Sequence, residues 1–290
     1  MAMEQKTDDI VTGAISEKLD NDYFPAFPED EEPLEILRVE STAPSAEEGH
    51  GLFARHEGVP AHVQAFLDQA RIVFVGGGGL NGATVVALVR SGARSVTIID
   101  DDRVELTNLS RQFFTVQDLG GPKGKRLARN VASHAIAGAE ITGIALPFEE
   151  AMAMYPLPAD LFIAGVDNNE CRLQVVREAR RRQVPAIFTM LSGDGMRCQC
   201  FKQDASPLGP CLWCALPNLD PEHHMPCSSA IISSCFMAAG FTTFFAHRAL
   251  MGWGNLEPFN WREADLSGRA PDRIGRITKR SGCPACSVVG

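Results

Sequence analysis

A glycine-rich turn between two apolar segments constrains the fold of this chain more than any other feature. The β-branched run Ile72–Val75 predicts a buried strand, and the segment after the glycines, Gly82–Ser91, has the apolar period of a helix. A second apolar run, Val96–Ile99, predicts another strand and ends on Asp100. Strand, tight turn, helix and strand in this order are typical of a nucleotide-binding unit in an α/β protein.

Four consecutive glycines form the predicted turn. Glycine lets the backbone bend tightly and approach a phosphate, and a helix N-terminus offers free N–H groups to an anion. We therefore expect Gly76, Gly78 and Gly79 to contact a nucleotide and Asp100 to bind the ribose hydroxyls. In the G-x-G-x-x-G frame that starts at Gly76, the third glycine is replaced by Asn81, so the glycines alone leave an ordinary strand–helix turn open.

The polar segment after Asp100 separates two classes of enzyme. Within residues 104–112, Asn108 and Arg111 are three positions apart, so one helical turn would place them on the same face. Arginine offers a planar fork of donors to phosphate oxygens, and Lys123 can add a second positive charge. An NAD-dependent oxidoreductase has no use for these residues, whereas each of them taken alone also fits a solvated polar loop.

Asp100 also begins a longer pattern, D-x-D-x-V-x-x-x-N-L-x-R-Q, which is followed by G-x-P-K. The pattern resembles the ThiF/MoeB-type adenylyltransferases, relatives of the ubiquitin-activating enzymes. The matching residues are Asp100, Asn108, Arg111, Gln112, Gly121 and Lys123. The resemblance extends from about residue 55 to the C-terminus. It implies a Rossmann-like fold, ATP and Mg²⁺ as cofactors, and phosphate binding by Asn108, Arg111 and Lys123.

A further acidic residue, Asp167, follows the apolar run Leu161–Val166, which predicts another strand. Open α/β sheets bind ligands at the carboxyl ends of their strands, and a carboxylate there can hold a magnesium ion between phosphates. Asp167 occupies this position, although an acid after a strand is also a common helix N-cap. The resemblance favours the metal-binding role and adds the neighbouring Asn168 to the nucleotide site.

Strands and helices alternate along the rest of the chain. Further strands are expected at residues 140–146, 161–166, 185–190 and 196–202, and the last is a candidate for antiparallel pairing. Helices are expected at residues 61–70, 123–138, 170–182 and 236–250. This alternation predicts a mainly parallel sheet with helices on both faces. We expect Lys125, Arg126 and Arg129 to form a solvated helix face and the apolar segment 236–250 to be buried.

Two C-x-x-C pairs predict a metal centre: Cys211 with Cys214, and Cys283 with Cys286. Four thiolates suit a closed tetrahedral zinc site, and such a site has no open position for catalysis. The pairs are 69 positions apart, from residue 214 to residue 283, so the fold must bring them together. Unconnected thiols in loops are the alternative. A second pair near the C-terminus also matches the resembling family.

Cys227 lies in a polar loop shortly before the segment 236–250. A helix N-terminus lowers the pKa of a nearby thiol, and the resembling family carries a nucleophilic cysteine in this loop. Cys227 is therefore a candidate acceptor for a second step, with an unreactive loop thiol as the alternative. The remaining thiols and the loop histidines are expected to be structural or plain surface groups: Cys171, Cys198, Cys200, Cys235, His223 and His224.

The first fifty residues carry fourteen acidic and three basic side chains with four prolines. This composition predicts an acidic extension, residues 1–50, ahead of an adenylyltransferase domain at residues 51–290. Apolar clusters at residues 23–27 and 34–37 leave docking on a surface as open as disorder. Arg55 corresponds in rough position to a family arginine that reaches the nucleotide of a partner subunit, and a surface arginine is the alternative.

Composition excludes several classes of protein. Hydrophobic residues make up 45% of the chain without a run of eighteen apolar residues, which argues against a membrane span. The first residues lack a secretory signal, so we expect the cytoplasm and reduced thiols. The net charge is −9 and no basic stripe is present, which argues against nucleic-acid binding.

The resemblance implies ATP-dependent adenylation of the C-terminal glycine of a small ubiquitin-fold protein, followed by transfer to a cysteine. The chain would then be a homodimeric activating enzyme of a conjugation pathway that passes its product to a downstream enzyme. The alternative is a sulfur-carrier-protein adenylyltransferase in molybdopterin, thiamine or related biosynthesis. A scaffold that binds a ubiquitin-fold partner without catalysis is a further alternative, against which the complete phosphate-binding set argues.

Overall fold

The strands of the described chain form one sheet. This computed structural model describes residues 36–41, 51–56, 59, 63–136, 138–220, 229–251 and 259–287, which all belong to one compact unit. The strands are β1 (Ile36–Glu40), β2 (Arg71–Val75), β3 (Ser95–Ile99), β4 (Glu140–Ile144), β5 (Leu161–Ala164), β6 (Ala186–Leu191), β7 (Arg197–Gln203), β8 (Trp261–Asp265) and β9 (Arg273–Gly275). Their order across the sheet is β1-β4-β3-β2-β5-β6-β7-β8-β9. The five strands from β4 to β6 are parallel, and the flanking strands are antiparallel.

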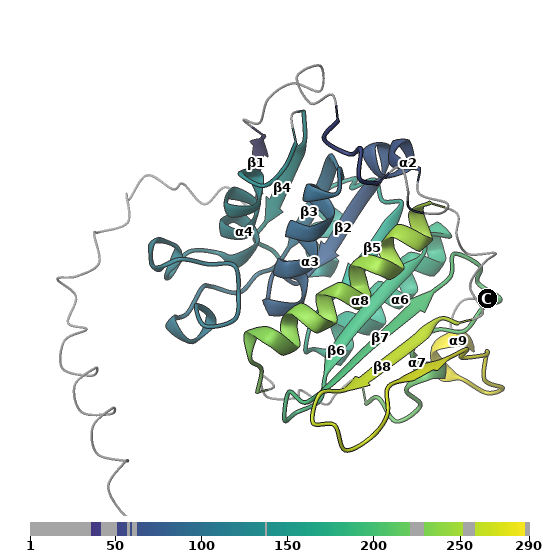
Figure 1. Cartoon of the computed structure of the whole chain (residues 1–290). Helices are drawn as coiled ribbons and strands as arrows, with labels where there is room; N and C mark the ends of the chain where they lie inside the picture. The colour runs from purple at the N-terminus through teal and green to yellow at the C-terminus, as the bar shows by residue number, and fades with distance from the viewer. Residues whose placement is uncertain are drawn as a thin grey trace, which may run out of the picture. The chain divides into compact units, whose positions relative to one another are not determined.

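Helices cover both faces of this sheet (Figure 1). They are α2 (Gln64–Gln69), α3 (Gly79–Arg90), α4 (Lys123–Ala132), α5 (Phe148–Met154), α6 (Asn169–Arg182), α7 (Leu212–Ala215), α8 (Ile232–Leu250) and α9 (Pro284–Ser287), with short 3-10 helices η2 (Leu106–Asn108) and η3 (Val116–Asp118). Helices α3, α4 and α8 share one hydrophobic core, whereas α5, α6, α7 and α9 share the other. The expected mainly parallel sheet with helices on both faces is confirmed. Among the described helices, none combines the length and apolar composition needed to cross a bilayer.

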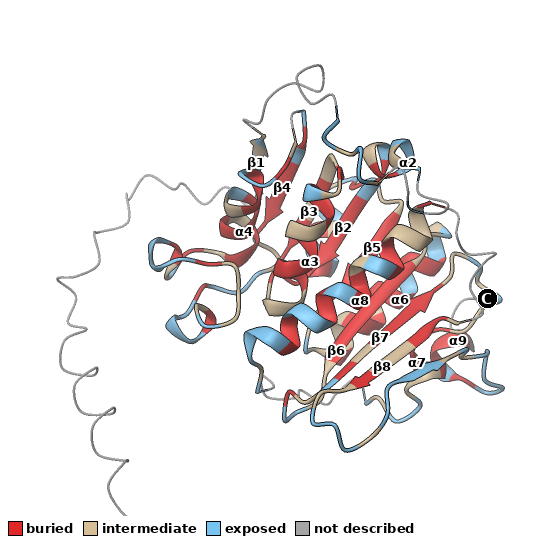
Figure 2. Cartoon of the chain, in the orientation of Figure 1, coloured by how far each residue is buried: buried red, intermediate tan, exposed pale blue. Residues whose placement is uncertain are grey.

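The central strands are mostly apolar, as suits a sheet that is covered on both of its faces (Figure 2). In β2, Ile72 and Phe74 belong to the core beneath α3 and α8, while Val73 and Val75 belong to the core beneath α6. Successive side chains of a strand point to opposite faces, so one β-branched run supplies both cores.

Several helix boundaries and one helix face differ from the sequence-based expectation. Helix α3 begins at Gly79 rather than at Gly82, and α4 ends at Ala132 rather than at residue 138. The prediction of a solvated face is right for Arg129 but wrong for Arg126, whose side chain is buried. Arg126 packs against Gly121, where a Cβ atom would collide with its guanidinium. The helical period alone does not show this contact.

Helix α8 is longer and less buried than expected. It begins at Ile232, and its side chains Phe236, Met237 and Phe244 are 50%, 45% and 45% exposed. Figure 2 shows exposed segments along the side of α8 that faces away from the sheet. The prediction of a fully buried helix is therefore wrong, because α8 covers α3 and the sheet with one face only.

Strand β1 adds an edge to the sheet that the sequence did not predict. It pairs antiparallel with β4, from Ile36 opposite Ile144 to Glu40 opposite Glu140. Of the two alternatives for the apolar cluster at residues 34–37, Ile36 and Leu37 are therefore docked. Tyr23, Phe24 and Phe27 lie outside the described residues, and the division at residue 50 stays a prediction.

Candidate functional site

A cleft of about 550 Å³ lies at the carboxyl ends of the parallel strands. The chain runs from β2 to β3 and β4 on one side and continues with β5 and β6 on the other, so the strand order reverses next to β2. Open α/β sheets bind ligands at such a reversal. All nine residues predicted to bind the nucleotide line this cleft: Gly76, Gly78, Gly79, Asp100, Asn108, Arg111, Lys123, Asp167 and Asn168. Their roles toward a ligand stay predictions.

The glycine turn is shaped by two positions that exclude a side chain. Gly76 has a φ of +89°, and a Cβ there would lie 2.8 Å from Cγ1 of Val166. At Gly79, a Cβ would lie 2.8 Å from Sγ of Cys235. Asn81 occupies the position of the missing third glycine and donates from Nδ2 to the carbonyl oxygens of residues 75 and 76, both at 2.8 Å. A side-chain amide therefore holds the turn at the end of β2.

Asp100 joins the turn from the end of β3. Its Oδ2 accepts a hydrogen bond from the backbone N–H of Gly77 at 2.5 Å, and its Oδ1 accepts one from Asp102 at 2.9 Å. Burial raises the pKa of this carboxyl to about 6, although both backbone N–H groups act in the opposite direction. Asp100 is therefore mostly ionised at neutral pH and can accept hydrogen bonds from ribose hydroxyls.

Asn108 and Arg111 lie at the end of η2. Oδ1 of Asn108 accepts a hydrogen bond from the backbone N–H of Glu105 at 2.9 Å, so this buried side chain anchors the loop. Nη1 of Arg111 donates to the carbonyl of Thr107 at 2.7 Å. The guanidinium is thereby held at the rim of the cleft, where its fork of donors suits phosphate oxygens.

Lys123 is a buried cation at the start of α4. Its Nζ donates to Oδ2 of Asp102 at 2.8 Å. Burial lowers the pKa of Lys123, but the carboxylates of Asp102, Asp100 and Glu105 outweigh it and hold the pKa above its usual value. The ammonium is therefore charged at neutral pH. Its partner Asp102 was not predicted, because the sequence does not show which acidic residue of a polar loop faces inward.

The sequence left two roles open for Asp167, a helix N-cap and a metal ligand. The structure assigns the N-cap to the neighbouring Asn168. Asn168 is the N-cap of α6, since its Oδ1 accepts hydrogen bonds from the N–H groups of Glu170 and Cys171 at 2.9 and 3.2 Å. Asp167 is exposed and lines the cleft. The helix does not use its carboxylate as a cap, which leaves the carboxylate oxygens for a ligand. Carboxylate oxygens are ligands that Mg²⁺ prefers, so the donor set fits this ion.

Arg172 is a cleft residue that the sequence analysis missed. It is buried and donates to the carbonyl of Val166 and to Oδ1 of Asn169, both at 2.5 Å. Nδ2 of Asn169 in turn donates to the carbonyl of Asp220 at 2.9 Å. Burial lowers the pKa of Arg172 to about 10, with Asp167 acting in the opposite direction. Arg172 is four positions before the buried Val176, within the apolar stripe of α6, but the helical period does not show whether a long charged side chain at such a position is buried.

One of the predicted site residues, Arg55, does not line the cleft. Arg55 is exposed in the segment 51–56, whose Phe53 lies beside Gly92 at the C-terminal end of α3. The glycine turn lies at the opposite end of this helix. Cys227, together with both loop histidines, lies outside the described residues.

Of the other described thiols, Cys198, Cys200 and Cys235 are buried and Cys171 is half-buried. Cys198 and Cys200 lie on β7 beneath α8, and burial raises the pKa of the Cys200 thiol to about 12. Burial likewise raises the pKa of Cys171 to about 12. Cys235 is buried in the first turn of α8, where it also lines the cleft beside Gly79. These thiols are neutral at physiological pH, which makes them poor nucleophiles.

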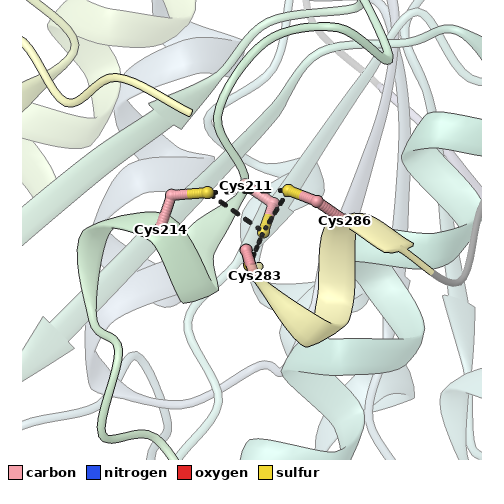
Figure 3. A group of neighbouring side chains, drawn as sticks. All are labelled: Cys211, Cys214, Cys283 and Cys286. Carbon is pink, nitrogen blue, oxygen red and sulfur yellow. Dashed lines mark hydrogen bonds between the residues drawn. The ribbon is translucent and has the colours of Figure 1, made fainter. Parts of the chain in front are cut away.

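The four cysteines of the two C-x-x-C pairs form one cluster (Figure 3). Their sulfur atoms all lie within 4.8 Å of one another, and neighbouring pairs are 3.4–4.0 Å apart. A tetrahedron of Zn–S bonds of about 2.3 Å has edges of about 3.8 Å, so the cluster fits a zinc ion. Cys211 immediately precedes α7 and Cys214 lies within it, and in the same way Cys283 immediately precedes α9 and Cys286 lies within it. The fold thus joins the two pairs, as the sequence predicts.

The model of the ThiF family matches residues 53–285, which is most of the chain. Among curated relatives, the sulfur carrier protein ThiS adenylyltransferase of Bacillus subtilis is 31% identical over 234 residues, 78% of this chain and 67% of that protein. The sulfur carrier protein adenylyltransferase of Thermus thermophilus is 31% identical over 175 residues, 58% of this chain and 63% of that protein.

The catalytic subunit of the NEDD8-activating enzyme E1 of Arabidopsis thaliana is 35% identical over 106 residues, 36% of this chain. This chain spans 23% of the Arabidopsis subunit and 63% of the Thermus protein. Among solved structures, Escherichia coli MccB with MccA-N7isoASN has a TM-score of 0.67 at 18% identity and covers 82% of this chain and 75% of MccB. The structure of MccB with ATP has a TM-score of 0.64 at 18% identity and covers 84% of this chain and 77% of MccB. At this identity the likeness concerns the fold. From the family model over residues 53–285, the chain belongs to the ThiF family.

Proposed function

We propose that the protein adenylates the C-terminal carboxylate of a small ubiquitin-fold protein, with ATP as the second substrate. The observation that supports this proposal is the convergence of two acids (Asp100 and Asp167), two cations (Arg111 and Lys123) and a glycine turn on a single cleft at the strand-order reversal. The names of the relatives agree with it, since two of them are sulfur carrier protein adenylyltransferases.

In the proposed reaction, the carboxylate attacks the α-phosphate of ATP and pyrophosphate leaves. The protein then has little covalent chemistry to do, so its contribution is positioning and neutralisation of charge. Asp100 accepts hydrogen bonds from the ribose, and the glycine turn brings its backbone close to the nucleotide. Arg111 and Lys123 bind the phosphate oxygens and stabilise the charge that develops on them. A magnesium ion bound by Asp167 would neutralise further phosphate charge.

The test is exchange of labelled pyrophosphate into ATP. We expect exchange that requires both magnesium and a ubiquitin-fold protein ending in glycine, and loss of exchange when that glycine is removed. Binding of the partner without any exchange would instead support a scaffold. Reduction of a nicotinamide cofactor in place of exchange would support an oxidoreductase.

Two fates of the adenylate remain as candidate functions. In a conjugation pathway, the thiolate of Cys227 attacks the carbonyl of the acyl-adenylate, AMP leaves, and the resulting thioester is passed to a downstream enzyme. In a sulfur-transfer pathway, sulfide-level sulfur from a separate donor displaces AMP from the acyl-adenylate and leaves a thiocarboxylate on the sulfur carrier. The second fate is supported by the relatives, because the Bacillus enzyme aligns with 78% of this chain and the Arabidopsis subunit with 36%.

Substitution of Cys227 distinguishes the two fates of the adenylate experimentally. Adenylation needs no thiol, so Cys227→Ala should retain pyrophosphate exchange and lose any reductant-sensitive adduct with the partner. Cys235→Ala is the matched control and should retain both, because this thiol is buried and neutral. Mass spectrometry that maps an adduct to another cysteine, or finds none while adenylate accumulates, would remove Cys227 from the reaction.

A further inference from the structure

Arg180 on α6 is a buried arginine that reaches the four-cysteine cluster. Its side chain is 3% exposed. Nη1 donates to the carbonyl of Pro207 at 3.1 Å, and Nη2 donates to the carbonyl of Gly209 at 2.8 Å. The same Nη2 donates to Sγ of Cys286 at 3.5 Å. The guanidinium therefore lies between the loop that leads to Cys211 and one of the four sulfur atoms.

The positive charge of Arg180 has no acidic partner in the described part of the chain. The next two arginines of α6 differ in this respect, since Arg181 and Arg182 both form ion pairs with Glu178. Arg180 instead contacts carbonyl oxygens and a sulfur atom, and its buried Nε has no hydrogen-bond partner among the described residues. A buried charge is costly unless an opposite charge compensates it.

The metal centre would supply that opposite charge. Four thiolates around a divalent ion carry a net charge of −2, because four negative charges exceed the two of the ion. We propose that Arg180 is the charge partner of the four-cysteine centre and that it determines how tightly the centre holds zinc or another thiolate-preferring divalent ion. This inference is independent of the adenylation reaction.

The same side chain also shapes the centre. Through the carbonyls of Pro207 and Gly209, Arg180 fixes the segment that immediately precedes Cys211. Groups that orient or electrostatically support metal ligands commonly change metal affinity about 10- to 100-fold. The charge of Arg180 thus acts most directly on Cys286 and its carbonyl contacts on the segment before Cys211, and the two contributions can be separated by the choice of substitution.

The experiment is a zinc competition titration of the full chain against a chromogenic chelator. Arg180→Met removes the charge and keeps the apolar stem, whereas Arg180→Lys keeps a charge and loses the planar fork. We expect Arg180→Met to weaken zinc binding about 10- to 100-fold and Arg180→Lys to weaken it less. Arg181→Met is the matched control and should bind zinc as the wild type does, because Arg181 is exposed and paired with Glu178.

Thermal unfolding distinguishes a charge partner from a packing residue. Arg180→Met should lower the midpoint of the zinc-loaded protein more than that of the chelator-treated protein, because only the loaded centre carries the compensating charge. Equal lowering in both states, or Arg180→Lys and Arg180→Met binding zinc equally weakly, would overturn the proposal. If Arg180→Met does not fold, retention of zinc affinity by Arg180→Lys supports the charge role and its loss overturns it.

Discussion

Gly78 and Gly79 are adjacent, yet an added methyl group meets different surroundings at each position. At Gly78 the nearest side-chain atom would be Nε2 of Gln112 at 3.9 Å, so the protein has room for a methyl group that would project into the cleft. At Gly79 the methyl group would collide with Sγ of Cys235. Packing therefore requires the second glycine but leaves space for a side chain at the first.

Gly78→Ala is therefore expected to weaken ATP binding at least about tenfold, ~1.4 kcal/mol, without lowering the thermal midpoint. Gly79→Ala should also lower the free energy of unfolding, by roughly 1–3 kcal/mol, because the core must shift. Calorimetric titration with ATP and thermal unfolding check both variants. Unchanged ATP affinity in Gly78→Ala would show that the nucleotide does not approach this glycine.

The raised pKa of Asp100 predicts a pH dependence of nucleotide binding. In the proposed complex the ribose hydroxyls donate to the ionised carboxylate, so ATP affinity should rise as the pH increases through about 6. The unliganded protein should show the opposite trend. Because the pKa in the folded state exceeds the unfolded value of 3.8, the folded state binds more protons between about pH 4 and 6, and stability falls as the pH rises through this window.

Titrations with ATP at pH 5 to 8 test this dependence. Asp100→Asn is the comparison variant, since it cannot ionise and should give weak binding with a flatter profile. A wild-type profile as flat as that of the variant would exclude Asp100 as the titrating group.

At the scale of elements, the two polar residues between β5 and α6, Asp167 and Asn168, are expected to have different effects when they are substituted. Asn168→Ala should lower the free energy of unfolding by about 1 kcal/mol, because it removes the N-cap of α6. Asp167→Ala should leave stability nearly unchanged and abolish magnesium-dependent pyrophosphate exchange. Chemical unfolding and exchange assays measure the two effects. Undiminished exchange in Asp167→Ala would remove this carboxylate from the mechanism.

At the scale of the whole molecule, the exposed apolar face of helix α8 bears on the oligomeric state. One of its faces packs on α3 and the sheet, and the other exposes Phe236, Met237 and Phe244. We propose that this face contributes to the homodimer that the resemblance implies. Arg55 then becomes relevant, because it lies away from the cleft of its own chain and could serve the cleft of a partner.

Phe236→Glu combined with Phe244→Glu should therefore shift the protein from dimer to monomer, because buried charge opposes association. Light scattering at micromolar concentration measures this shift. Leu208→Glu is a matched control on an exposed leucine away from α8 and should leave the oligomeric state unchanged. A wild-type protein that is monomeric with and without its partner would contradict the dimer and the role of Arg55 in a second cleft.

Local order explains why much of the cleft was predictable. The turn, Asp100 and the segment from Asn108 to Lys123 lie within fifty residues of one another, and their spacing reflects one strand–helix–strand unit. The two C-x-x-C pairs were predictable for a different reason, since thiolate chemistry links them despite their separation in sequence. The roles of Asp167 and Asn168 were not separable, because both residue types can cap a helix and the cap depends on backbone geometry.

The sequence by itself determined the α/β class and the two C-x-x-C pairs through residue type and short-range spacing, and it singled out the nine cleft residues through that spacing together with the family resemblance. Only the tertiary structure decided which of the arginines of α6 are buried. Arg172 turns toward the cleft and Arg180 toward the sulfur atoms, whereas Arg181 stays in solvent with Glu178. It also decided that Ile36–Glu40 completes the sheet edge and that α8 keeps an exposed apolar face. Burial is set by segments that are distant along the chain, so no local pattern of residues specifies it.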